Sequence, residues 1–330
     1  MDRSVKVALA LGSGGARGYA HIGAVQVLQE RGVEFVTVAG SSMGALVGGL
    51  LSAGKLDDYT DWVVGMSQFD VLRMLDVSLS APGAIRAEKI FARVRELLGD
   101  VMIEDLPIPF TAVATDLLAR REVWFQRGPA DVAIRASIAI PGVFTPVMLN
   151  GRMLVDGGVM DPIPIAPTAA VQADVTIAVS LGGDRRGTPD AVPVRESTED
   201  TPVEDWGERF RRGATALLDR DVVRSWMSRF GSTNTVGDEQ LNSDGEAAPS
   251  DADGAQASIG RFDVMNQSLE AMQSVLTRYC LAAHPPDVMV TIPKDACRSV
   301  DFHRAADMIE IGRALTIEAL EASDVAGLMG

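Results

Sequence analysis

The sequence predicts a three-layer α/β/α sandwich with a mostly parallel central sheet. Strand-like and helix-like segments alternate through its first third, with strands expected at 5–11 and 34–39 and helices at 18–31 and 43–53. This alternation is typical of parallel strands that are joined by helical crossovers. The strand segments are short apolar runs without polar interruption, as expected where helices cover both faces of a sheet.

Similar patterns continue through the rest of the chain. We expect helices at 56–66, 84–98, 132–140, 262–281 and 302–322, and strands at 109–115, 122–126, 153–155, 174–181 and 287–292. Asn150-Gly151 favours a tight hairpin turn, after which the short return strand delivers Asp156 at its end.

Composition divides the chain into three expected parts. Residues 1–181 form the core, 182–258 an acidic insertion, and 259–330 a C-terminal part that completes the domain of the core. Residues 231–258 contain six acidic residues and no Lys or Arg, so we expect disorder or weak order there. Between the polar ends, residues 206–230 carry two apolar stripes that break near 219–221. This pattern favours two short helices, which are either ordinary surface helices or a lid.

The charge of the chain excludes one class of partner and limits another. A formal net charge of −15 disfavours nucleic acid, which needs clustered Lys and Arg. It also argues against purely electrostatic docking on anionic membranes but leaves apolar insertion open. Cys280 and Cys297 lack CxxC spacing, so neither a disulfide scaffold nor a zinc site is indicated. Without a visible secretory signal, we expect a cytoplasmic protein that contacts the inner face of the membrane transiently.

The sharpest local signal is the pentapeptide Gly40-Ser41-Ser42-Met43-Gly44, placed between an expected strand and an expected helix. This tight turn exposes Ser42 as a candidate nucleophile, and the glycines two residues before and after it prevent clashes. The amide of Met43 at the helix start is a candidate donor to a developing oxyanion.

A second glycine-rich loop, Gly12-Ser13-Gly14-Gly15-Ala16-Arg17-Gly18, directly follows the first strand. The amides of Gly14 and Gly15 are candidate oxyanion donors, while Arg17 is a candidate to hold the loop by hydrogen bonds. A dinucleotide fold is the competing interpretation, with the glycines on a pyrophosphate and Glu34 on the ribose. That interpretation leaves the turn at Ser42 unexplained.

The partner base of Ser42 is expected to be Asp156 rather than a histidine. None of the three histidines, His21, His284 and His303, follows an acid in the Ser, Asp, His order of α/β-hydrolase triads. In Asp156-Gly157-Gly158, two glycines let the backbone turn sharply after the strand. Because a free aspartate is a weak base, either burial must raise its pKa or the oxyanion donors must contribute more.

Taken together, the motifs GSGGARG, GSSMG, DGG and ASIAIPGVFTPV resemble those of the patatin-like phospholipases. Within that family the sequence is similar to bacterial proteins related to neuropathy target esterase. The resemblance covers roughly residues 5–181 and, more loosely, the C-terminal helix. It implies a catalytic dyad of Ser42 and Asp156, with Gly14, Gly15 and Arg17 in the oxyanion loop.

The resemblance further implies a serine acyl-hydrolase that acts on a lipid ester, such as a phospholipid or lysophospholipid. It implies release of a fatty acid through an acyl-enzyme, without a metal or cofactor. Ser13 departs from the glycine that commonly stands first in the loop, but the next two amides are intact. The alternative is a non-catalytic regulator that keeps the fold to bind a lipid or a partner. The oligomeric state does not follow from the sequence.

Overall fold

The computed structural model describes residues 4–74, 76–77, 85–86, 88–183, 261–325 and 327. The expected lid helices and nearly all of the acidic insertion lie outside these residues. The parts of the chain before and after the insertion pack together in one compact unit.

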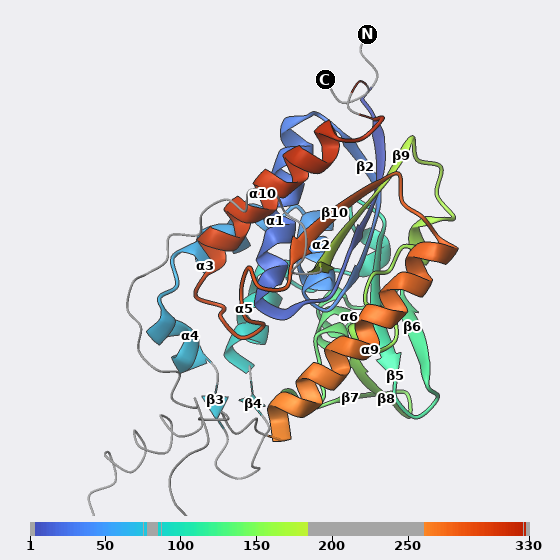
Figure 1. The fold of residues 1–330 in the computed structure, drawn as a ribbon. Helices are drawn as coiled ribbons and strands as arrows, with labels where there is room; N and C mark the ends of the chain where they lie inside the picture. The colour runs from blue at the N-terminus through green and yellow to red at the C-terminus, as the bar shows by residue number, and fades with distance from the viewer. Residues whose placement is uncertain are drawn as a thin grey trace, which may run out of the picture. The chain divides into compact units, whose positions relative to one another are not determined.

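The described residues form an eight-stranded mixed sheet (Figure 1). Its parallel part has the order β10 (Val288–Pro293), β9 (Val175–Gly183), β1 (Lys6–Leu11), β2 (Glu34–Ser41) and β5 (Phe110–Asp116). The antiparallel strands are β6 (Arg121–Phe125), β7 (Val147–Leu149) and β8 (Arg152–Asp156). The predicted α/β sandwich is therefore confirmed, with antiparallel strands added beside β5.

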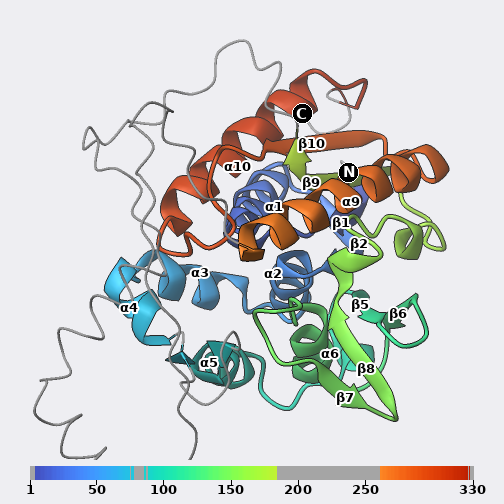
Figure 2. The ribbon, with the colours of Figure 1, turned by 60° about the horizontal axis from the view of Figure 1, so that its bottom comes forward.

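The helices provide the two outer layers. A 3-10 turn, η1 (Gly15–Tyr19), leads into α1 (Ala20–Glu30), and α2 (Met43–Ser52), α6 (Ala130–Ser137) and α10 (Ala305–Glu321) follow along the chain. Figure 1 shows α10 lying along α1, and Figure 2 shows α1, α2 and α6 in a row beside the strands. Helix α9 (Arg261–Ala283) belongs to the other layer.

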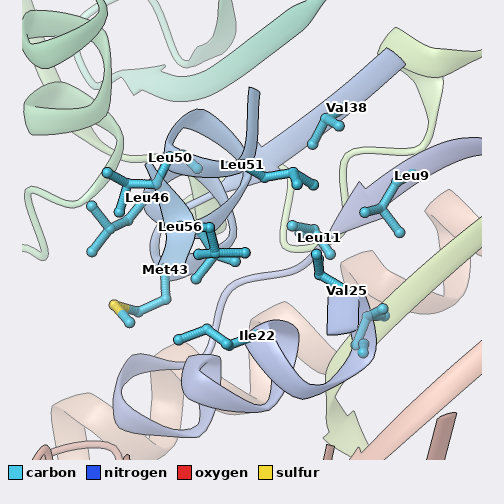
Figure 3. Close-up of a cluster of buried hydrophobic side chains, with 14 of the residues drawn as sticks. Leu9, Leu11, Ile22, Val25, Val38, Met43, Leu46, Leu50, Leu51 and Leu56 are labelled. Carbon is cyan, nitrogen blue, oxygen red and sulfur yellow. The ribbon is translucent and has the colours of Figure 1, made fainter. Parts of the chain in front are cut away.

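Side chains along β1 alternate between the two faces of the sheet and join two different hydrophobic clusters. Val7, Leu9 and Leu11 join the large cluster that includes side chains of α1 and α2 (Figure 3). Ala10, from the opposite face, joins a smaller cluster against which Leu281 of α9 packs. A strand covered on both faces reads as an unbroken apolar run, which is why the sequence pattern predicted it.

The hairpin before Asp156 forms as the sequence predicts. Asn150 and Gly151 have φ values of 50° and 75°, and Leu149 pairs with Arg152 across the turn. Positive φ at both central residues is characteristic of the type I′ turn, whose twist matches that of the flanking strands.

One predicted helix is partly wrong. The helix expected at 84–98 is α5 (Glu88–Leu98), because Ile85–Arg86 instead forms β4 and pairs with β3 (Asp76–Val77). The turn signal Pro82-Gly83 and the β-branched Ile85 favour this outcome. Helix α3 (Leu56–Val64) matches its prediction, whereas α4 (Gln68–Met74) was not predicted. Within the described ranges, no helix combines the length and apolar character that crossing a membrane requires.

Candidate active site

Ser42 directly follows β2, and Asp156 is the last residue of β8. Both strands pair with the same edge of β5. Strand β2 pairs with the first half of β5 and places Ser41 opposite Val113, whereas β8 runs antiparallel along the second half and places Asp156 opposite Ala114. Strand β6 pairs with both halves and so occupies the other edge. The carboxyl ends of β2 and β8 therefore face each other across consecutive positions of β5.

The turn at Ser42 is strained and closely packed. Ser42 has φ 57° and ψ −123°, a conformation that a residue with a side chain rarely adopts. A Cβ on Gly40 would lie 2.2 Å from the carbonyl oxygen of Gly44, and one on Gly44 would lie 2.0 Å from the carbonyl oxygen of Leu11. Only glycine fits at either position, so the predicted role of the two glycines agrees with the packing.

Ser137 of α6 supports this turn through two hydrogen bonds. The backbone N–H of Ser42 donates to Ser137 Oγ at 2.9 Å, and Ser137 Oγ donates to the carbonyl oxygen of Val113 at 2.5 Å. All three residues are buried. The hydroxyl thus connects the strained backbone of the turn to the strand beside it. The sequence contained Ser137 within ASIAIPGVFTPV but gave no sign of this role.

The side chains of Ser42 and Asp156 are directly hydrogen-bonded. Ser42 Oγ donates to Asp156 Oδ2 at 2.5 Å, and the backbone N–H of Gly158 donates to Asp156 Oδ1 at 2.8 Å. The carboxylate is also positioned through its own backbone, whose N–H donates to the carbonyl oxygen of Ala139 at 2.9 Å. Both carboxylate oxygens are therefore engaged, one of them by the candidate nucleophile.

Burial raises the pKa of Asp156 from 3.8 to about 6, although the hydrogen bonds from Ser42 and Gly158 act to lower it. Desolvation dominates because the side chain is almost wholly enclosed, with 4% of the residue exposed. The carboxylate remains mostly ionised at neutral pH and is a stronger base than a free aspartate. Asp156 therefore has the raised pKa that an aspartate needs to act as a base without a histidine.

The glycines after Asp156 allow its loop to pack tightly. A Cβ on Gly157 would lie 2.1 Å from the carbonyl oxygen of Val113, and one on Gly158 would lie 2.4 Å from Ser13 Oγ. Side chains at these positions would push the loop away from β5 and from the glycine-rich loop. The DGG motif therefore brings Asp156 to Ser42, as its sequence suggested.

The glycine-rich loop offers two free amides beside Ser42. The neighbouring amides make backbone hydrogen bonds: Gly12 to Val179, Ser13 to Pro162 and Ala16 to Ser299. The N–H groups of Gly14 and Gly15 have no acceptor in the part of the chain that the structure describes. Both glycines line the same small pocket as Ser42 and Asp156, so their amides are available to a ligand there.

Met43 and Gly18 lie where the glycine-rich loop packs against the turn at Ser42. Met43 begins α2 directly after Ser42, and its amide makes no hydrogen bond with the described residues. It is not among the residues that line the pocket. A Cβ on Gly18 would lie 2.3 Å from Cβ of Met43, so glycine at 18 lets the loop approach the turn.

Arg17 ties the glycine-rich loop to the C-terminal part of the chain. Its Nη1 donates to the carbonyl oxygens of Lys294 at 3.3 Å and Cys297 at 3.2 Å, and its Nη2 lies 3.5 Å from Glu270 Oε1. The residue is buried, with 6% exposed, and also borders the pocket. These contacts hold the glycine-rich loop against the C-terminal part of the chain, which is the role expected of Arg17.

Helix α9 supplies site residues that sequence reasoning missed. Gln273 Nε2 donates to the carbonyl oxygen of Gly158 at 2.9 Å, and Leu269, Glu270 and Gln273 line the pocket of about 70 Å³ beside Ser42. Glu270, Gln273 and Thr277 repeat at helical spacing, which marks a polar face. That face was the only local signal, and it does not say which loop it contacts.

The histidines take no part in the site. His21 is buried, its Nε2 lies 2.8 Å from the carbonyl oxygen of Gly12, and burial lowers its pKa to about 4. His284 is exposed, and neither it nor His303 lines the pocket. Across the described ranges, no group of three or more His, Cys, Asp or Glu side chains is arranged to hold a metal ion.

Comparisons with known proteins give the family. A model of the family described as patatin-like phospholipase matches residues 9–169. Uncharacterized NTE family proteins of Mycobacterium bovis and Mycobacterium tuberculosis are 48% identical to the chain, over 98% of it and 93% of their own length. This chain belongs to the NTE family of patatin-like phospholipases. The predicted family is therefore confirmed.

More distant NTE relatives carry a named activity. A protein of Emericella nidulans called lysophospholipase nte1 is 29% identical over 56% of this chain, which corresponds to 12% of that protein. Family membership supports a lipid ester hydrolase in general terms. The family match at 9–169 includes Ser42, Asp156 and the glycine-rich loop of this NTE-family chain, and α9 lies beyond it.

Proposed function

We propose that this NTE-family protein hydrolyses lipid esters with Ser42 as nucleophile and Asp156 as base. The observation that carries the proposal is the 2.5 Å hydrogen bond from Ser42 Oγ to Asp156 Oδ2. It supports proton transfer because the acceptor is a carboxylate of raised pKa and the donor, although buried, stands on a strained turn beside the pocket.

Acylation begins when Ser42 Oγ attacks the ester carbonyl carbon and its proton passes to Asp156 Oδ2. The carbonyl oxygen becomes negatively charged, and the amides of Gly14 and Gly15 stabilise it, with Met43 as a further donor. Each such donor typically contributes about 3 kcal/mol to the transition state. As the tetrahedral intermediate collapses, the proton on Asp156 passes to the leaving alcohol, and an acyl-enzyme remains.

Deacylation repeats these steps with water. Asp156 accepts a proton from a water molecule that attacks the acyl-enzyme carbonyl, and Ser42 leaves with a proton as the fatty acid is released. The names of the distant NTE relatives support a lysophospholipid as the substrate, and the description of the family supports a phospholipid. The chemistry uses only side chains and amides of this chain, so the proposal includes no metal or cofactor.

The protein is proposed to meet its substrate by transient contact at the inner face of the membrane. Met272, Val275 and Tyr279 of α9 are exposed at helical spacing, and 71% of Tyr279 is accessible. Exposed apolar side chains on the helix that lines the pocket suit shallow insertion among lipids. The net charge of −15 disfavours electrostatic attraction to an anionic bilayer surface, so apolar insertion would carry this contact.

Fatty acid release from lipids tests the proposal. Wild-type protein and the variants Ser42→Ala and Ser41→Ala are incubated with a total lipid extract, and free fatty acids and remaining lipids are measured by mass spectrometry. Ser41 is the matched control because it is the buried neighbour of Ser42 and its hydroxyl has no partner among the described residues.

Wild type and Ser41→Ala are expected to release fatty acid, and Ser42→Ala is expected to lose this activity. Binding of lipid without hydrolysis by the wild type would instead support the non-catalytic regulator. Equal fatty acid release by wild type and Ser42→Ala would overturn the assignment of the nucleophile.

A further inference from the structure

A second pocket, of about 270 Å³, adjoins the catalytic one. The two share five lining residues: Ser13, Gly14, Arg17, Glu270 and Gln273. The wall of the second pocket continues from them along the end of β9, along β10 and along the C-terminal half of α9. Carboxyl ends of parallel strands are where ligands bind in open α/β sheets, and both pockets lie along this edge.

The charge around the second pocket is opposite to that of the chain. Its lining carries three cations, Arg17, Arg278 and Lys294, against one acid, Glu270, whereas the whole chain has 30 Lys and Arg against 45 Asp and Glu. Arg17 lies against Glu270. Neither Lys294 nor Arg278 forms an ion pair with any residue that the structure describes. Two positive charges in the wall are therefore left for a ligand.

The remaining wall has two kinds of surface. Hydroxyl groups come from Ser180, Ser274 and Thr291, and apolar surface comes from Pro162, Leu281 and Met289. An anion can therefore find cations and hydrogen-bond donors together, while carbon atoms of the same ligand contact the apolar part. At about 270 Å³, the pocket is large enough for one polar portion of a lipid but smaller than most sites for whole ligands, which begin near about 300 Å³.

We infer that this pocket binds the phosphate group of a phosphate-bearing ester, with Lys294 and Arg278 as its cationic partners. The inference rests on the proposed function and assigns Lys294 and Arg278 as the residues that distinguish a phosphate-bearing ester from a neutral glycerolipid. A glycerol unit joins the phosphate to the ester, so adjoining pockets can hold the two groups of one molecule. A neutral lipid would leave both cations without a partner, whereas a phosphate forms charge-assisted hydrogen bonds with them.

Paired substrates test the inference. Lysophosphatidylglycerol and the monoacylglycerol with the same acyl chain are hydrolysed by wild type and by the double variant K294M/R278Q, and kcat/KM is measured for each. Met at 294 keeps the apolar stem and the backbone carbonyl that accepts from Arg17. The matched control is K55M/R93Q, because Lys55 and Arg93 line neither pocket.

The ratio of kcat/KM for the phosphate-bearing substrate to that for the neutral one is expected to fall about tenfold in K294M/R278Q, mainly through KM. The control variant should keep the wild-type ratio. An unchanged ratio in K294M/R278Q, with both lipids still hydrolysed by wild type, overturns the phosphate site and leaves the proposed function standing.

A binding measurement separates this inference from the ester chemistry. Calorimetry with sn-glycerol 3-phosphate and with inorganic phosphate is performed on Ser42→Ala protein with and without K294M/R278Q. Loss of sn-glycerol 3-phosphate binding in the double variant supports the site even if no lipid is hydrolysed. Equal binding with and without the two cations overturns it. Equal affinity for both probes indicates free phosphate as the ligand and overturns the headgroup assignment.

Discussion

Ser42 and Asp156 are hydrogen-bonded because β2 and β8 approach each other from opposite directions along one edge of β5. Ser41 pairs with Val113 and Asp156 with Ala114, so the two carboxyl ends meet at consecutive positions. The geometry of the dyad is therefore set by sheet register, and small changes of that register would separate the pair.

The pH dependence of the reaction follows from the raised pKa of Asp156, about 6. Asp156 must be ionised to accept a proton, so kcat/KM for a soluble short-chain ester should rise with pH and reach a plateau above about pH 7. Below pH 6 the rate should fall about tenfold per pH unit. An acid limb centred near 4, the range of a free aspartate, would show that burial does not tune this base.

Asp156→Asn should lower activity and raise stability at neutral pH. Without the base, kcat should fall by about 10²–10⁴-fold. The folded-state pKa lies above the unfolded value, so ionising Asp156 disfavours the folded protein, and this penalty grows as pH rises from about 4 to 6. At pH 7.5 the variant should be more stable than wild type by up to about 3 kcal/mol, a gain that disappears below about pH 4.

Urea unfolding of wild type and Asp156→Asn at pH 4 and pH 7.5 measures this difference. Asp295→Asn, which removes one carboxylate at an exposed position, is the matched control. A variant that is less stable than wild type at both pH values would contradict a desolvated carboxylate at 156.

Ser137→Ala should weaken the support of the turn at Ser42. The change removes the acceptor of the Ser42 N–H and the donor to Val113, and should cost about 1–3 kcal/mol of stability. Misplacement of Ser42 should lower kcat about tenfold with little change in KM. Ser52→Ala is the control, since this buried hydroxyl has no partner among the described residues. Equal stability and equal kcat of Ser137→Ala and Ser52→Ala would show that Ser137 does not support the turn at Ser42.

Gln273→Leu should loosen the loop that carries Asp156. Its amide donates to the carbonyl oxygen of Gly158, whose own N–H lowers the pKa of Asp156. Losing this support should lower kcat several-fold and move the acid limb of the pH profile upward. Gln29→Leu, on the exposed side of α1, serves as the comparison. A drop in kcat without movement of the acid limb would mean that Gln273 does not act through the pKa of Asp156.

The sequence predicted the parts of the site that depend on neighbours along the chain. The turn at Ser42 is recognisable because Gly40, Gly44 and the strand-to-helix transition lie within a few residues. The Asn150-Gly151 hairpin is local in the same way. The region around Ile85 was assigned wrongly because a short strand pairing with Asp76–Val77 overrode helical periodicity.

Contacts between distant segments could not be predicted in this way. Ser137 is 95 residues from Ser42, and Gln273 is 115 residues from Gly158, so no periodicity or turn signal connects them. The sequence indicated that Asp156 ends a strand, but not that this strand would share an edge of β5 with β2. The raised pKa of Asp156 also depends on burial by the whole site.

Covalent labelling by a fluorophosphonate tests the central claim most directly. Peptide mass spectrometry of the labelled protein should place the adduct on Ser42, at a rate that rises with pH around a pKa of about 6 and falls sharply in Asp156→Asn. An adduct on another residue, or a labelling rate at Ser42 that is the same in wild type and Asp156→Asn, would contradict the dyad.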